Sequence, residues 1–160
     1  MNISVEHIAL PAADPSALKN WYEQVLGAKV VFDNGQNPPT YLISLANVWL
    51  EIYRAEAPLP ERGNNKLAGF RHLALKVDSL ATARTELEKR GVKFTEEIRP
   101  AAGAGSVLFF ADGEGNLLHL VERPANFKWC WLPASPGSFI SILPGRGRGA
   151  KGLWFDGGLA

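Results

Sequence analysis

Hydrophobic and polar positions follow the same order in both halves of the chain. The segment His7–Leu10 (His-Ile-Ala-Leu) recurs as His72–Leu75 (His-Leu-Ala-Leu), and each copy precedes a stretch of helical spacing that ends in a glycine. Each half then reaches a late apolar stretch, Trp49–Ile52 in the first and Leu117–Leu120 in the second. Recurrence of this kind indicates a duplicated structural unit.

The first half predicts the order strand, helix, strand, strand, strand. Alternation of apolar and polar residues predicts a strand over residues 3–10. Asp14 followed by Pro15 is typical of a helix start, and apolar residues then recur at helical spacing up to Gly27, a natural helix stop. Three β-prone segments follow and predict strands, the last two as a hairpin: residues 28–33, 40–46 and 48–54.

The second half repeats this order after a linker. Residues 55–69 are rich in Pro, Gly, Asn and charge, which is typical of a connection between units. A helix is expected over residues 79–90 and ends at Gly91, and residues 112–116 predict the turn that joins the last two strands. The strands expected in this half are residues 70–77, 92–98, 106–111 and 116–122.

Two βαβββ units in one chain predict an α+β fold. A helix covers one face of each unit's sheet, and the other face is bare. Two such units can cover each other by forming a cupped, barrel-like mixed sheet with the helices outside. We therefore expect four parts: a first βαβββ module at 1–54, a linker at 55–69, a second module at 70–124, and a Pro/Gly/Trp-rich C-terminal extension at 125–160.

The period of two along a strand places three histidines and one carboxylate on the bare faces. His7 and His72 lie opposite the aliphatic neighbours that would pack under a helix, and Glu51 and His119 stand on the late strand of each half. Imidazole and carboxylate are donors in transition-metal sites. We expect the four to converge in the cup on a divalent ion (Zn, Ni, Mn or Fe), although a lone inward histidine is more often a hydrogen-bonded core residue.

Other residues near this set have alternative interpretations. Trp49 and Tyr53 share the face of Glu51, so they are expected either as walls of a substrate pocket or as plain core. Glu51 itself has the alternative of a carboxylate paired with a histidine. Glu122 competes with His119 as a ligand, but strand parity places Glu122 on the opposite face.

Composition limits the classes of partner. The chain has 160 residues, 46% of them hydrophobic and 21% charged, with a formal net charge of +1. These values give no electrostatic reason to expect nucleic acid or a membrane surface as partner. No apolar run is long enough to span a membrane, and no signal-peptide pattern opens the sequence. The single Cys130 excludes an internal disulfide, so we expect a cytoplasmic protein with a small-molecule substrate.

The C-terminal extension differs from both repeats. It is rich in Pro and Gly and has no periodicity, yet it carries several large apolar rings, which is unusual for a disordered tail. We expect part of it to pack on the body or on a second subunit, with Trp129 and Trp131 as anchors. The alternative is an extension without function.

The whole arrangement resembles the vicinal oxygen chelate superfamily. That group includes glyoxalase I, fosfomycin-resistance thiol transferases, methylmalonyl-CoA epimerases, extradiol dioxygenases and bleomycin-resistance proteins. The resemblance covers about residues 3–124, and residues 112–118 (Asp-Gly-Glu-Gly-Asn-Leu-Leu) resemble the family's Asp-Pro-(Asp/Glu)-Gly-Asn turn before the last ligand strand. It implies a homodimer of two-module chains and carries over four metal ligands: His7, Glu51, His72 and His119.

The resemblance also implies a metal-dependent enzyme with isomerase- or lyase-type chemistry through a metal-bound enediolate or vicinal oxygens. Glu51 would be ligand, base or both. The sequence departs from the family at His119, where a glutamate is more usual. It also gives no clear match to the glutathione-binding arginines among Arg71, Arg99 and Arg123. Strand parity assigns two of these, Arg71 and Arg123, to faces away from the cup. The alternatives are a metal-free drug- or metabolite-binding protein, an Fe(II) extradiol-type dioxygenase and a fosfomycin-resistance-type transferase.

Overall fold

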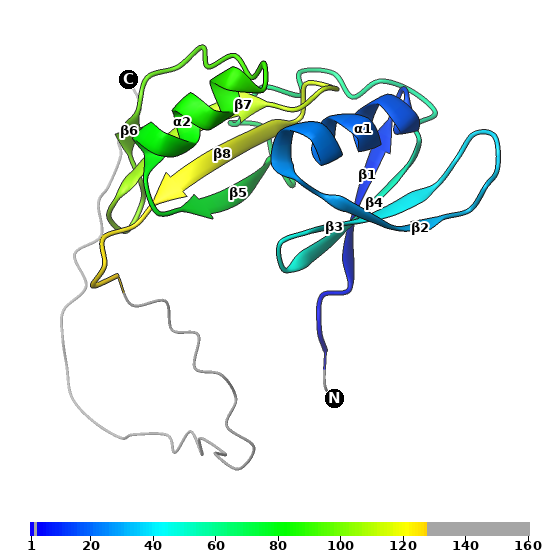
Figure 1. The fold of residues 1–160 in the computed structure, drawn as a ribbon, viewed down its shortest axis with the longest axis horizontal. Coiled ribbons are helices and arrows are strands. Elements are labelled where there is room, and N and C mark those ends of the chain that lie inside the picture. The colour runs from blue at the N-terminus through cyan, green and yellow to red at the C-terminus, as the bar shows by residue number, and fades with distance from the viewer. Residues whose placement is uncertain (2, 128–160) are drawn as a thin grey trace, which may run out of the picture. The chain divides into compact units, whose positions relative to one another are not determined.

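The computed structural model describes residue 1 and residues 3–127. The chain divides into a compact unit, Met1–Phe127, and a second unit, Lys128–Ala160. The predictions about Trp129, Cys130 and Trp131 fall outside the described residues. Within the described part, the order βαβββ occurs twice (Figure 1).

The first half forms a four-stranded sheet with one helix across it. Strand β1 is parallel to β4, and the remaining neighbours are antiparallel, in the order β1-β4-β3-β2. Figure 1 shows α1 lying across one face of this sheet. The elements are β1 (His7–Ala12), α1 (Pro15–Leu26), β2 (Lys29–Asp33), β3 (Tyr41–Leu45) and β4 (Val48–Arg54).

The second half has the same topology. Its order is β5-β8-β7-β6, with β5 parallel to β8 and the other pairs antiparallel. The elements are β5 (His72–Val77), α2 (Leu80–Lys89), β6 (Arg99–Pro100), β7 (Ser106–Ala111) and β8 (Leu117–Glu122). Two mixed sheets with a helix on each confirm the α+β fold of paired βαβββ units, and neither sheet closes on itself.

Both helices begin and end where local signals predicted. Asp14 caps α1 by accepting a hydrogen bond from the N–H of Ala17, and Gly27 ends the helix in the left-handed conformation at φ 71°. Ser79 caps α2 in the same way by accepting from the N–H of Thr82. These signals act within one turn of the chain, so the sequence alone reveals them.

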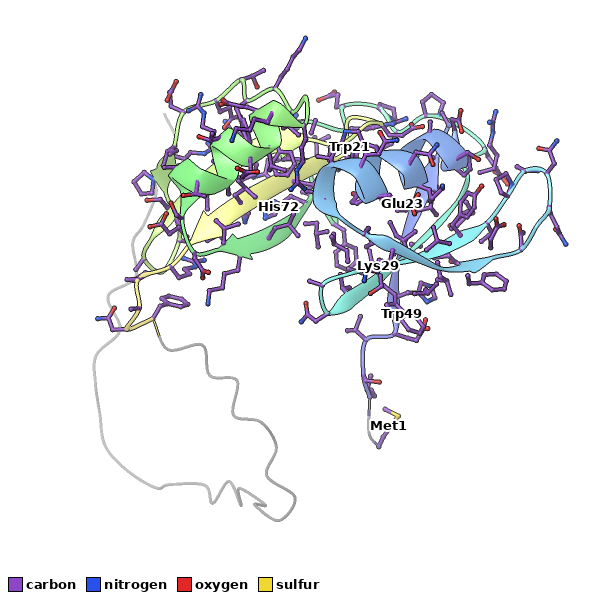
Figure 2. All side chains as sticks on the ribbon, viewed as in Figure 1. Met1, Trp21, Glu23, Lys29, Trp49 and His72 are labelled. Carbon is purple, nitrogen blue, oxygen red and sulfur yellow. The ribbon has the colours of Figure 1, made fainter. Side chains whose placement is uncertain are left out.

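Two strand predictions were wrong in their extent. β1 begins at His7 rather than residue 3, because its partner β4 begins at Val48 and residues before His7 have no strand to pair with. Ile3 and Val5 are therefore 80% exposed, on an arm that ends at Met1 (Figure 2). The strand expected at 92–98 is absent, and only Arg99–Pro100 pairs with β7. Apolar residues of that segment pack into the core without pairing.

The core lies between the helices and the sheets. The larger of two buried clusters includes residues of both halves, among them Tyr22 of α1, Leu50 of β4 and Leu108 of β7. Each of these side chains is at most 2% exposed. Most buried apolar residues therefore lie on the helix side of each sheet. On the opposite face of the second sheet, Val107, Phe109 and Val121 form a smaller buried cluster. No helix among the described residues is long and apolar enough to cross a membrane.

The predicted turn at residues 112–116 contains a buried carboxylate that links the two halves. Asp112 is 6% exposed and accepts hydrogen bonds from the N–H groups of Glu114 and Asn116, from the Asn116 side chain, and from the Tyr22 hydroxyl at 3.1 Å. Burial raises the pKa of Asp112 despite these hydrogen bonds, and burial together with the Asp112 charge raises the pKa of Tyr22 well above its usual value. The turn therefore connects β7 to β8 and also holds α1 of the first half to the second half through the Tyr22–Asp112 hydrogen bond.

Candidate metal and substrate site

The sequence-predicted site residues lie on the faces of the sheets that point away from the helices. In β4, Leu50 and Ile52 are 2% and 0% exposed in the core, so Glu51 and its alternate neighbours point the other way. Figure 2 shows Trp49 on this bare side of the first sheet. In β5 the residues that share the parity of His72 are exposed, while those between them pack on the core.

The first sheet brings His7 and Glu51 together. The Nε2 atom of His7 lies 3.4 Å from Oε2 of Glu51. Two donors that each lie about 2.1 Å from a tetrahedral ion are about 3.4 Å apart, so this spacing fits a shared metal. The Nδ1 atom of His7 binds the Glu6 carboxylate; this hydrogen bond is the main reason why the pKa of His7 is raised, and the charges of Glu6 and Glu51 add to it against desolvation.

The second sheet brings His72 and His119 together. Their ring centres are 4.5 Å apart at an angle of 36°, and the ring of Phe109 packs edge-on against both. The Nδ1–H of His72 donates to Oδ1 of Asn65 at 2.8 Å. The Nδ1 atom of His119 is buried and has no hydrogen-bond partner among the described residues. A buried, unpaired ring nitrogen is costly unless a ligand completes it.

The environment of His119 keeps its ring neutral. Desolvation is the largest cause, and His72, Arg123 and Arg99 add to it, which together lower the pKa of His119 to about 4. Neutral imidazole is the form that coordinates a metal. Of the other arginines considered from the sequence, Arg123 donates to the carbonyls of Ala102 and Ala104, and Arg71 donates to the carbonyl of Arg62 in the linker.

The two first-strand histidines share one further feature. In both His7 and His72, Nδ1 is hydrogen-bonded to a side-chain oxygen, which leaves Nε2 as the lone-pair nitrogen. Metal-ligating histidines commonly donate their other ring N–H to an oxygen acceptor in this manner. Glu6 and Asn65, which provide these oxygens, were missed by sequence reasoning. Glu6 adjoins His7 in the sequence, whereas nothing in the linker pattern marked Asn65.

Within one chain the four predicted ligands form two pairs rather than one cluster. The His7–Glu51 pair belongs to the first sheet and the His72–His119 pair to the second. Among the described residues, no three His, Cys, Asp or Glu side chains lie close enough to hold one ion. Each pair consists of two side chains of types that coordinate divalent metals in other proteins.

Large apolar side chains accompany the first pair. Trp49 is 41% exposed and Tyr53 is partly exposed on the face of Glu51. Side chains exposed to this extent are not plain core. They are available to contact a substrate or another chain.

Comparison with known proteins identifies the family. Residues 4–120 match the sequence model of the Glyoxalase/Bleomycin resistance protein/Dioxygenase superfamily. The chain belongs to this superfamily. It is 31% identical over 126 residues to the uncharacterized protein YwkD of Bacillus subtilis, a match that covers 75% of this chain and 97% of YwkD.

Solved structures of the superfamily share the fold. A glyoxalase family protein from Enterococcus faecalis is 29% identical, with a TM-score of 0.63 over 74% of this chain and 97% of that one. The fosfomycin resistance protein FosX from Listeria monocytogenes, solved with Mn(II) and sulfate, is 17% identical, with a TM-score of 0.58 over 78% of this chain and 94% of that one. At this identity the likeness to FosX is one of fold. The predicted family and fold class are confirmed.

Proposed function

We propose that this protein is a metal-dependent enzyme of the glyoxalase-like type, with isomerase or lyase chemistry on a small molecule that carries two adjacent oxygens. The observation that supports it most is the matched setting of His7 and His72, each held through Nδ1 by a side-chain oxygen, with Nε2 of His7 lying 3.4 Å from Oε2 of Glu51. This is how a protein prepares an imidazole as a ligand. A hydrogen-bonded core histidine would instead be buried, and both of these are exposed.

We infer that two copies of the chain complete the site. Both pairs lie on sheet faces that point away from the helices, and the first sheet also exposes Trp49 and Phe32, at 41% and 50%. Exposed apolar side chains of this size favour an interface. In a two-fold dimer, the His7–Glu51 pair of one chain facing the His72–His119 pair of the other would produce two identical four-ligand sites.

A bound divalent ion supplies a Lewis acid that polarises adjacent substrate oxygens. The residues of the chain would hold the transferred proton, exclude water and orient the substrate. Glu51 is the carboxylate of the ligand set, so its Oε atoms are the place where a proton taken from the carbon beside a carbonyl would be held. The family's more usual glutamate is replaced by His119, which leaves this role to Glu51. Trp49 and Tyr53 beside it would exclude water and orient the substrate.

Metal uptake is the direct test. Protein purified without added metal, and after incubation with micromolar Zn²⁺, Ni²⁺, Mn²⁺ or Fe²⁺, is analysed for bound metal; we expect about one ion per chain. His7→Ala, His72→Ala and Glu51→Gln should each lower the affinity. Glu97→Gln is the matched control, because that side chain is 93% exposed outside the site. An absence of uptake would refute the proposal and favour the metal-free binding protein.

The reaction itself is tested by proton exchange. Metal-loaded protein is incubated in D₂O with small 2-hydroxycarbonyl compounds, and incorporation of deuterium next to the carbonyl is followed by NMR. We expect Glu51→Gln to lose exchange even when metal is added to saturation. Consumption of O₂ by the Fe²⁺-loaded protein without any exchange would contradict the proposed reaction and favour ring-cleaving oxygenation.

A further inference from the structure

The face of the second sheet that points away from α2, called the bare face below, carries basic side chains at both of its edges. Lys76 pairs with Val121, Val121 with Val107, and Val107 with Arg99, so a cation stands at each end of one row across four strands. The one carboxylate in these strands, Glu122, points to the helix side, where it accepts a hydrogen bond from the first N–H of α2. The ionisable side chains of β5–β8 on the bare face are therefore all bases: His72, Lys76, Arg99 and His119.

Arg99 holds its charge close to the His72–His119 pair. Its guanidinium carbon lies 4.5 Å from the centre of the Phe109 ring, and the Phe109 ring centre lies 4.7 Å from that of His119. Taken end to end, these distances put the guanidinium at most about 9 Å from the imidazole. A small substrate can span this distance.

The guanidinium of Arg99 has N–H donors beyond the one that faces its ion-pair partner. One nitrogen, Nη2, lies 2.9 Å from Oε2 of Glu96, and the two side chains are 51% and 47% exposed. An exposed ion pair contributes little stability, so a bound anion can replace or share it. Arginine presents five N–H donors in a planar fork that matches carboxylate and phosphonate oxygens. Arg123, by contrast, is engaged in holding the carbonyls of Ala102 and Ala104.

We propose that the substrate carries a negatively charged group, a carboxylate or a phosphonate, which binds Arg99 while the substrate's two adjacent oxygens lie at the His72–His119 pair. Lys76, at the other end of the same row, adds a second positive charge. This assignment of substrate class rests on the proposed function. It makes Arg99 a specificity-determining residue rather than a surface ion pair.

The test uses three probes that share two adjacent ring oxygens and differ in charge. These are 3,4-dihydroxybenzoate, 3,4-dihydroxyphenylphosphonate and the neutral 3,4-dihydroxybenzamide, titrated calorimetrically into the full-length Zn²⁺-loaded protein. We expect the anions to bind about tenfold tighter than the amide, which is the scale of one charge-assisted hydrogen bond. The relative affinity of the two anions distinguishes carboxylate from phosphonate as the preferred group.

Arg99→Gln should remove the preference for the anions and leave the affinity for the amide and the uptake of Zn²⁺ unchanged. Lys76→Gln should weaken anion binding in the same direction. Arg84→Gln is the matched control, because the Arg84 guanidinium also lies over an aromatic ring, at 5.8 Å from Phe94, and also pairs with a carboxylate, but on α2. Equal binding of all three probes by the unmodified protein, or an anion preference that survives in Arg99→Gln, would overturn the proposal.

A second arm separates this proposal from the proposed function. The same probes are titrated into metal-free protein and followed by NMR shifts of the β5–β8 amides. An Arg99-dependent preference for the anions would support the charge assignment even if Zn²⁺ uptake fails. Normal Zn²⁺ uptake without any anion preference in either arm would refute the charge assignment alone.

Discussion

The linker residue Asn65 offers a test of how the chain prepares a ligand. Its Oδ1 accepts the Nδ1–H of His72 at 2.8 Å, which favours the tautomer that has its lone pair on Nε2. In Asn65→Ala this acceptor is lost, and His72 can adopt either tautomer and turn about its side-chain bonds. We therefore expect weaker metal binding without any change in the ligands themselves.

The size of the effect follows from the exposure of the contact. Loss of an oxygen that orients a ligating histidine commonly lowers metal affinity by about 10- to 100-fold. Because His72 is exposed, water can partly replace Asn65 as acceptor, which favours the lower end of this range. A tenfold loss corresponds to about 1.4 kcal/mol of binding free energy.

The assay is calorimetric titration of Zn²⁺ into metal-free protein, together with ¹⁵N shifts of the His72 ring, which report the tautomer. Asn65→Asp keeps an oxygen acceptor at the same place and should retain most of the affinity. Asn64→Ala is the control for the linker, since Asn64 bonds to Glu61 and Lys66 rather than to a histidine. Unchanged affinity and an unchanged tautomer in Asn65→Ala would refute the reasoning.

Two further predictions concern the fold. An added Cβ at Gly105 would lie 2.1 Å from the backbone oxygen of Glu122, whereas at Gly103, which also has positive φ, the nearest atom is 3.7 Å away. In denaturant unfolding, Gly105→Ala should therefore cost about 3 kcal/mol and Gly103→Ala about 1 kcal/mol, and equal losses would contradict the clash. Burial, aided by the Asp112 charge, raises the pKa of Tyr22, so the folded chain keeps a phenol proton that the unfolded chain loses above pH 10. The stability from this group is intact below pH 10 and falls above it by up to about 1.4 kcal/mol per pH unit, a component that Tyr22→Phe should lack; parallel curves would argue against it.

Elements that depend on neighbouring residues in the sequence were predictable. Asp14 and Gly27 mark the ends of α1 because capping is decided within one turn. Strand ends are decided by the partner strand instead. β1 therefore starts late, at the residue where β4 provides a partner. The apolar residues of the segment 92–98 pack into the core without forming a strand.

The candidate site likewise has features that follow from the local sequence and features that depend on distant parts of the chain. Strand parity is local, so it correctly placed Glu51 and Trp49 opposite the core residues of β4. Which ligands share an ion depends on how two sheets, or two chains, face each other, and strand parity carries no information about that. The contact between Asn65 and His72 and the burial of Asp112 also depend on how loops fold back, for which the sequence pattern contains no signal.

Subunit mixing tests the central claim that the His7–Glu51 pair of one chain and the His72–His119 pair of another hold one ion. Neither the His7→Ala nor the His72→Ala protein should bind metal tightly. When the two are unfolded, mixed in equal amounts and refolded, half of the dimers contain one chain of each kind, and each mixed dimer has one intact site of its two. We predict recovery of about one tightly bound ion per four chains. No recovery above the separate variants would contradict the shared site.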